Sequence, residues 1–252
     1  MTPYPGAVHE PDQAVTAPAA PDQVRWGLGD AAVGWLLGLV GGALVGGLVL
    51  AATGADDFDD VSLGWMAVAQ LGLWVGLLGV PLVVAKTKGN GLVRDFGLRV
   101  TGRDVWVGAG VGLIAQYAII WIVYLPLQLL TDISSSDITE PAREMTDRAD
   151  DPLGVILLVV ILGFGAPIVE EIFYRGLLQR SLVRRIGQPL GVGVSALVFA
   201  ASHLQPLQFP ALLLFGIVLG VLAERYRRLG PAIAAHMVFN LTAVVSLLVS
   251  GS

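Results

Sequence analysis

The sequence contains no cysteine, which excludes disulfide bonds, thiolate metal sites and cysteine nucleophiles. Histidine is scarce too: His9 lies near the N-terminus, and His203 and His236 lie inside apolar segments. Charged residues make up only 14% of the 252 residues, against roughly 25% in soluble domains. The net charge of −5 is the sum of short clusters between apolar runs, so it says little about binding partners.

The chain instead contains long hydrophobic segments. Hydrophobic residues make up 55% of it, and the mean hydropathy is +0.74. A membrane-spanning helix needs about 20 apolar residues. We therefore predict an all-α, polytopic transmembrane helical bundle of about seven membrane segments. Their expected ranges are 27–53, 61–85, 104–130, 152–179, 190–203, 208–224 and 231–250.

The chain divides into three parts by composition. Residues 1–22 are rich in proline and alanine and have neither a basic start nor a hydrophobic run, so we expect a disordered tail and no signal peptide. Residues 23–151 hold the first transmembrane helices and their loops, and residues 152–252 form the last, four-segment part. No basic patch is interleaved with aromatic residues, so nucleic acid is not an expected partner.

The loop charges predict an orientation. Lys and Arg collect in 86–103, 180–185 and 225–228, which places these stretches in the cytoplasm. The loops 54–60 and 131–151 are mostly acidic and are expected outside. The prediction is a multi-pass protein of the plasma (inner) membrane with a cytoplasmic N-terminus.

Carboxylates occur where the bilayer makes them unfavourable. At about 1.5 Å per residue, Glu170 and Glu171 lie some 26 Å along the helix that begins after Asp151. A charge at such depth persists mainly where it lines a cavity or has a partner. Arg175, four residues after Glu171, is on the same helix face and is the expected partner. Glu170 points about 100° away and has no obvious local cation.

Three more polar residues reach the same depth from other segments. His203 ends a short segment, before a turn at 203–210 that contains two prolines and two glutamines. Such a turn is tolerated in the membrane only where protein or a watery cavity surrounds it. His236 and Asn240 lie one turn apart on one face of the last helix. We expect the six polar side chains to share one water-accessible pocket.

Each of these features also has a purely structural interpretation. A single intramembrane histidine or asparagine often serves as a hydrogen bond between helices, and the Glu171–Arg175 pair can serve stability alone. Gly216 and Gly220 are spaced for a close helix contact. All six polar groups at one depth are harder to explain by structure alone, and favour a site.

Together, the three motifs resemble the CPBP family, the CAAX-protease and bacteriocin-processing (Abi) membrane proteins that include the Ras-converting CAAX endopeptidases. The matching stretches are residues 166–176 with Glu170-Glu171-x-x-x-Arg175, 199–203 with Phe199-x-x-x-His203, and 236–240 with His236-x-x-x-Asn240. The resemblance covers about residues 152–245, so the last part of the chain is expected to be a catalytic core.

The resemblance implies an endopeptidase that hydrolyses peptide bonds at the membrane without a covalent intermediate. Glu170 and His203 would activate a water molecule, and His236 and Asn240 would stabilise the oxyanion. Glu171 and Arg175 would position the site. The expected partners are membrane lipid and a membrane-associated peptide or protein substrate, of the CAAX type or another.

Alternatives remain open at this point. No cofactor is required by the mechanism above, but zinc could be bound by Glu170, His203 and His236, although the zincin motif His-Glu-x-x-His is missing. A non-enzymatic immunity or scaffold protein could keep every motif. A proton-coupled transporter could use Glu170 and His203 as a relay, but the sequence lacks the two comparable halves that this class predicts.

Overall fold

The chain folds as a bundle of helices, as seen in a computed structural model that describes residues 24–149 and 151–251. The described part contains no strand, which confirms the predicted all-α class. The expected tail at 1–22 lies outside the described residues. The first half comprises α1 (Leu28–Thr53), the 3₁₀ helix η1 (Phe58–Asp60), α2 (Leu63–Thr87), α3 (Leu92–Asp95), α4 (Gly102–Ile119), η2 (Ile120–Tyr124), α5 (Leu125–Leu130) and α6 (Ser135–Asp147). The second comprises α7 (Pro152–Leu158), η3 (Val159–Gly165), α8 (Ala166–Glu170), η4 (Glu171–Gln179), α9 (Arg180–Ile186), α10 (Gln188–Ala201), α11 (Phe209–Tyr226) and α12 (Gly230–Gly251).

Six continuous helical stretches of the described chain are long and apolar enough to cross a membrane. The fourth of them runs from Pro152 to Ile186, through α7, η3, α8, η4 and α9, and is longer than expected from the sequence. The seventh expected segment is α10, which has only 14 residues. At 1.5 Å per residue it spans about 21 Å, less than the hydrocarbon core. Gly187, with a φ of +81°, makes the sharp turn between α9 and α10.

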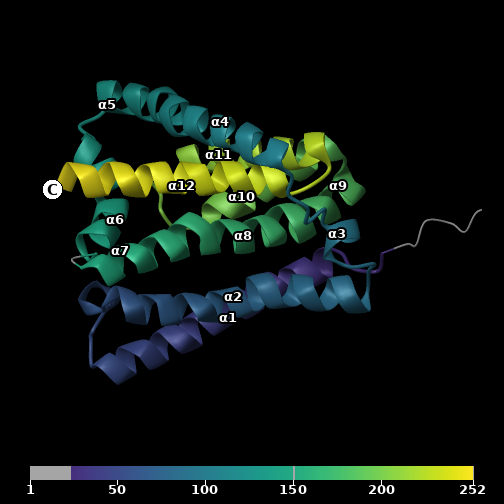
Figure 1. Ribbon diagram of the computed structural model, residues 1–252, viewed down its shortest axis with the longest axis horizontal. Coiled ribbons are helices and arrows are strands. Elements are labelled where there is room, and N and C mark those ends of the chain that lie inside the picture. Colours follow the sequence, from purple (N-terminus) through teal and green to yellow (C-terminus); the bar gives the residue numbers. More distant parts are fainter. Residues whose placement is uncertain (1–23, 150, 252) are drawn as a thin grey trace, which may run out of the picture.

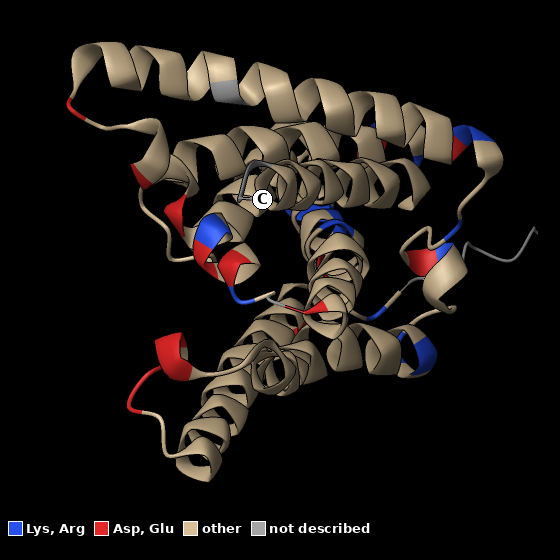
Figure 2. Ribbon diagram, turned by 60° about the vertical axis from the view of Figure 1, so that its left-hand side comes forward, with Lys and Arg blue, Asp and Glu red and all other residues tan. Residues whose placement is uncertain are grey.

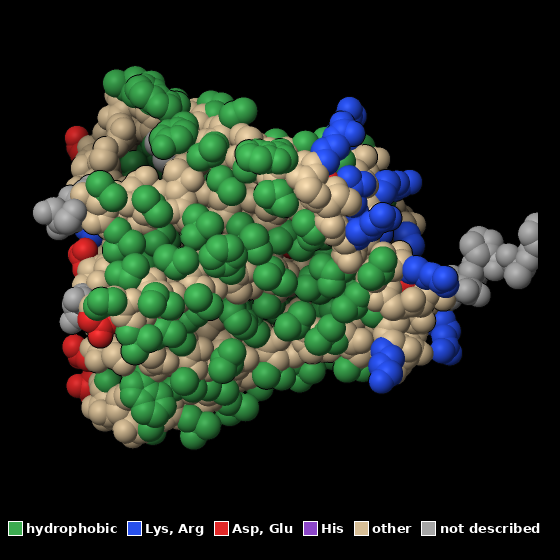
Figure 3. Space-filling model, viewed as in Figure 1, with side chains coloured by type: hydrophobic (Ala, Val, Ile, Leu, Met, Phe, Trp, Pro, Cys, Tyr) green, Lys and Arg blue, Asp and Glu red, His purple; other side chains and the backbone are tan. Residues whose placement is uncertain are grey.

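Lipid-facing and water-facing surfaces are separated along the molecule. Large hydrophobic side chains are exposed along the long helices, among them Leu48, Trp106 and Leu129, and Figure 3 shows a broad belt of hydrophobic side chains. An exposed apolar surface of this extent marks contact with lipid. Lys and Arg gather at one end of the molecule and Asp and Glu at the other (Figures 2 and 3). The protein is therefore a multi-pass membrane protein with a basic end and an acidic end.

The first two helices form a tight hairpin because glycines meet across it. A Cβ atom on Gly76 would lie 2.0 Å from the backbone nitrogen of Gly38, and one on Gly41 would lie 2.4 Å from the carbonyl oxygen of Gly72. Small residues allow this close approach in the membrane, where packing and not hydrophobicity holds helices together. Figure 1 shows α1 and α2 side by side, with the remaining long helices together on one side of the pair.

The helix that carries the two glutamates is irregular. The glycines and the proline at Gly163, Gly165 and Pro167, which the sequence marks as disturbing the helix, lie in or next to the π-helical stretch η3. A second π-helical stretch, η4, begins at Glu171. Such wide turns are rare and occur frequently at functional sites. They change the rotation of the helix, and hence the direction in which each glutamate points.

Two buried carboxylates hold the basic end together. Asp104, at the start of α4, is fully buried and accepts hydrogen bonds from the guanidinium of Arg228 at 2.6–3.1 Å. These bonds raise the pKa of Arg228 above its usual value. Asp95 accepts hydrogen bonds from the indole of Trp26 at 3.1 Å and from the backbone of Asn90 at 2.8 Å. The loops at this end are thereby tied to the helices that carry the motifs.

Candidate active site

A cavity of about 650 Å³ separates the α1–α2 hairpin from the helices of the second half. One of its walls is a stripe along the irregular helix, formed by Leu162, Ala166, Glu170 and Tyr174. These residues are four apart and therefore lie on one helix face. The opposite wall belongs to α1 and α2, and further lining residues come from α6, α11 and α12. The cavity reaches the acidic end beside η1 and α6, where Asp59, Glu144 and Arg148 line it.

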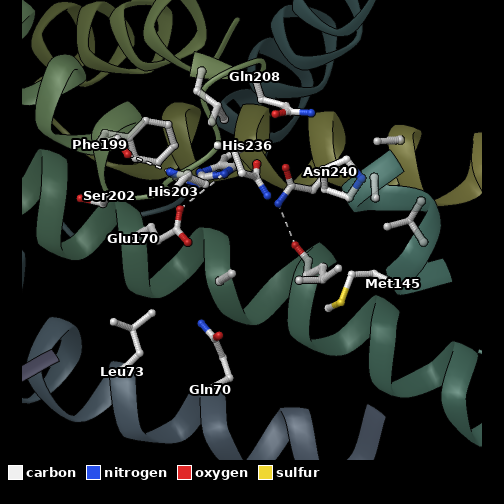
Figure 4. A pocket seen from close by; sticks show the side chains of 18 of the residues that line it. Gln70, Leu73, Met145, Glu170, Phe199, Ser202, His203, Gln208, His236 and Asn240 are labelled. Carbon is white, nitrogen blue, oxygen red and sulfur yellow. Dashed lines mark hydrogen bonds and ion pairs between the residues drawn. The ribbon is translucent and has the colours of Figure 1, made fainter. Parts of the chain in front are cut away.

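Glu170 is the carboxylate that faces this cavity. It is the last residue of α8, and 15% of its side chain is exposed. Its Oε2 atom lies 3.9 Å from Nε2 of His236, which is too far for a direct hydrogen bond. Figure 4 shows Glu170 on the same side of the helix as His203 and His236. The space between these groups is open to a water molecule or a substrate.

Glu171, by contrast, is fully buried behind the cavity. Its Oε1 atom accepts hydrogen bonds from Arg175 at 2.8 Å and from Nδ1 of His236 at 2.9 Å. The expected pairing with Arg175 is confirmed. Arg175 also donates to the carbonyl of Gly216 at 3.2 Å, and its guanidinium lies 4.3 Å from the centre of the Phe199 ring. Glu171 and Arg175 do not line the cavity; they hold the ring of His236.

The approach of α11 to α10 and η4 makes this arrangement possible. A Cβ atom on Gly216 would lie 3.1 Å from the side chain of Ala196, and one on Gly220 would lie 2.6 Å from that of Gln179. The expected close helix contact at these two glycines is confirmed. Their carbonyl oxygens accept hydrogen bonds from Arg175 and Gln179, respectively. The contact thus satisfies two polar side chains that are buried at membrane depth.

His203 lies just beyond the C-terminal end of α10, inside the cavity. Its Nδ1 atom is 2.8 Å from the carbonyl oxygen of Phe199. A carbonyl oxygen only accepts hydrogen bonds, so Nδ1 carries the hydrogen and Nε2 of the neutral ring is free to accept one. The Phe199 ring contacts both imidazoles edge-on, with centroid distances of 4.8 Å to His203 and 5.8 Å to His236. Phe199 is therefore the packing residue between the two histidines.

Asn240 lines the cavity one turn beyond His236 on α12. Its amide nitrogen donates to the carbonyl oxygen of Leu162, in η3, at 2.9 Å (Figure 4). This bond uses one of the two amide hydrogens and fixes the side chain against the irregular helix. The second hydrogen and the oxygen remain for the cavity. Of the six residues expected to share a pocket, four line it, namely Glu170, His203, His236 and Asn240.

The residues named for a metal do not form a ligand set. Within the part of the chain that the structure describes, no three His, Asp or Glu side chains are arranged to hold a metal ion. Nδ1 of His236 is bound to Glu171 and Nδ1 of His203 to a carbonyl, so Nε2 is the unbonded nitrogen of each ring in the cavity.

The sequence reasoning missed a helix that forms part of the cavity wall. The stretch 131–151 is expected as a plain acidic connection, but it contains α6. Ile138, Ala142 and Met145 of α6 line the cavity. The signal was present: the hydroxyl of Ser134 caps the backbone of Asp137 while the Asp137 carboxylate bonds back to Ser134, which is the capping-box pattern.

Residues 152–242 match the family described as type II CAAX prenyl endopeptidase Rce1-like. This segment is similar to the CAAX-protease family. It contains the three motifs, and the predicted resemblance over residues 152–245 is confirmed. No curated protein and no solved structure gives a significant match. The match supports, at the level of the family, a CAAX-type intramembrane peptidase with a membrane-associated protein as substrate.

Proposed function

We propose that this protein is an endopeptidase of the plasma (inner) membrane that hydrolyses peptide bonds of a membrane-associated substrate with a water molecule activated by Glu170 and His203. One observation carries the proposal. Polar side chains from α8, the α10–α11 turn and α12, all within the segment that matches the peptidase family, line a single cavity of about 650 Å³. The cysteine-free chain offers no thiol nucleophile, and we take water as the attacking group.

The histidine geometry supports the role in water activation. With Nδ1 of His203 bonded to the Phe199 carbonyl, the lone pair of Nε2 is available to take a proton from water. Glu170 supplies a second basic group in the same cavity, without a hydrogen bond to occupy it. A water held between these groups would lose a proton as it attacks the carbonyl carbon of the scissile bond.

His236 and Asn240 are placed to stabilise the negative oxygen that this attack creates. Donors fixed in a cavity of low dielectric constant stabilise developing charge more than the same donors do in water. Asn240 retains one amide hydrogen after bonding to Leu162. His236 already donates from Nδ1 to Glu171, so a contact through Nε2 requires the doubly protonated ring. Glu171 and Arg175 are positioning residues, since they act on the substrate only through His236.

The charge distribution supports the proposed topology. The basic end carries the Lys and Arg residues and would face the cytoplasm, together with the start of α1. The acidic end would face outward. In this arrangement the cavity extends towards the outer side, beside η1 and α6.

The test uses the full chain, purified and reconstituted in lipid vesicles, with two peptide probes. One is a farnesylated peptide ending in a CAAX motif, and the other is an unprenylated apolar peptide of equal length. We expect cleavage of one or both, and a 10²–10⁴-fold loss in Glu170→Gln and in His203→Asn. Glu140→Gln, on α6 but outside the cavity lining, is the control and should cleave normally.

Three results would overturn parts of this proposal. Full activity in both Glu170→Gln and His203→Asn would remove the water-activating pair. Binding of a partner protein without cleavage of any probe would support the immunity or scaffold alternative. Activity that is lost with a chelator and restored by Zn²⁺ would show that the reaction depends on zinc. The zinc-dependent mechanism, with Glu170, His203 and His236 as ligands, would then replace the metal-free one.

A further inference from the structure

The α2 wall of the cavity carries one amide among apolar side chains. The residues of α2 that line the cavity are Met66, Gln70, Leu73 and Leu77, which share one helix face. Gln70 is the polar member of this set. Figure 4 shows Gln70 and Leu73 extending from α2 towards the helix that bears Glu170. The amide thus faces the site from the opposite wall.

Gln70 has no partner within the part of the protein that the structure describes: no hydrogen bond involves its side chain. Two other polar side chains of the cavity, Ser202 and Gln208, differ in this respect. Ser202 bonds to Val198 and Trp35, and Gln208 bonds to the carbonyl of Ile138. Gln70 is half-buried, so its amide is accessible from the cavity. Both its donor and its acceptor are therefore available to a partner that enters the cavity.

The position of Gln70 along the cavity indicates what that partner is. A smaller cavity of about 70 Å³ adjoins the main one and shares with it Met66, Gln70, Met145 and Leu162. Gln70 therefore lies opposite Leu162, whose carbonyl holds Asn240. A chain that enters from the acidic end towards Glu170 passes between Gln70 and Asn240.

We infer that Gln70 binds the substrate, its side-chain amide forming hydrogen bonds with the backbone of an extended peptide in the cavity. This inference rests on the proposed peptidase function. A peptide backbone in an apolar space must find partners for its N–H and C=O groups. A glutamine offers both a donor and an acceptor, so it can bond one peptide unit on both sides whatever the substrate side chains are.

The first experiment measures kinetics on the unprenylated apolar peptide with Gln70→Met, Gln70→Asn and Gln116→Met. Methionine matches glutamine in length and removes the amide, so the variant is expected to fold. Gln116 lies on α4 outside the cavity, and its side-chain oxygen is likewise unpaired, which makes it the matched control. We expect KM to rise about 3- to 10-fold in Gln70→Met with kcat nearly unchanged. The reason is the loss of one hydrogen bond that is equally strong in the enzyme–substrate complex and in the transition state. Gln70→Asn should recover part of the loss, and Gln116→Met should match the wild type.

The second experiment locates the bond on the substrate. Peptides methylated at one backbone nitrogen at a time lose a donor at a known position. One such peptide should bind the wild type more weakly, and its penalty should disappear in Gln70→Met, because the two changes remove the same bond. Equal penalties in wild type and Gln70→Met at every position, together with an unchanged KM, would overturn the inference while leaving the peptidase intact.

A third measurement does not depend on cleavage. Because the chain has no cysteine, Gln70→Cys in a Glu170→Gln background introduces a single thiol. A peptide carrying one cysteine should form a disulfide with it, and should not do so with Gln116→Cys. Cross-linking without cleavage in the wild type would keep the binding site and remove the peptidase proposal. No cross-linking at position 70 would contradict the binding role directly.

Discussion

The Nδ1 atom of His236 lies 2.9 Å from Oε1 of Glu171, the same oxygen that accepts a hydrogen bond from Arg175. One carboxylate oxygen thus joins a buried cation to the imidazole that faces the cavity. The orientation of His236 is set from behind by residues that no substrate touches. The position of the ring therefore depends on the buried ion pair.

Breaking that ion pair should destabilise the protein and disturb the site. Glu171→Leu leaves the buried charge of Arg175 without its partner, and we expect a loss of about 3–5 kcal/mol in the free energy of unfolding. The double variant Glu171→Leu/Arg175→Leu removes both charges and should recover most of the stability, but not the activity. Thermal unfolding in detergent and peptide cleavage measure the two effects. Recovered activity in the double variant would show that the pair serves stability alone.

Asn240 should matter for the rate of reaction more than for binding. We expect Asn240→Ala to lower kcat about 10²- to 10³-fold, the usual effect of removing one donor from an oxyanion site, with a small change in KM. The comparison is Asn240→Asp, which keeps the size of the side chain but lacks the donors. A rise in KM with unchanged kcat would instead assign Asn240 to substrate binding.

Arg148 should control access at the acidic end. It follows α6 and donates to the carbonyl of Phe58 at 2.6 Å and to the carboxylate of Asp59 at 3.2 Å, which ties α6 to the α1–α2 connection. Loss of these bonds in Arg148→Gln should make a thiol at Ala142→Cys react about 3- to 10-fold faster with a water-soluble maleimide. Arg143→Gln, an exposed position on the same helix, is the control. Equal rates in both variants would mean that α6 is held by other contacts.

The α1–α2 hairpin should tolerate a methyl group at one glycine and not at another. A Cβ atom at Gly76 meets the backbone of Gly38 at 2.0 Å, whereas one at Gly79 meets nothing within 4 Å. We expect Gly76→Ala to reduce stability by about 1–3 kcal/mol through overpacking. Gly79→Ala should be neutral or stabilising by up to ~1 kcal/mol, since alanine favours helix. Equal thermal midpoints for the two variants would contradict the observed packing.

The sequence alone determined the class of the protein and which polar residues reach one depth in the membrane. The apolar runs are long enough to cross a bilayer, so they predict membrane-spanning helices. The rise of 1.5 Å per residue then gives the depth of the polar residues, namely Glu170, His203, His236 and Asn240. The pairing of Glu171 with Arg175 also follows from local geometry, because residues four apart share a helix face.

Only the tertiary structure decided what those residues touch. The hydrogen bonds of His236 to Glu171, of Asn240 to Leu162 and of Arg175 to Gly216 join helices that are far apart in the sequence. They depend on how each helix is rotated about its axis, and the π-helical turns η3 and η4 alter that rotation where the glutamates lie. The same holds for Gln70 and α6, because a wall of the cavity exists only once the hairpin and the core have packed around it.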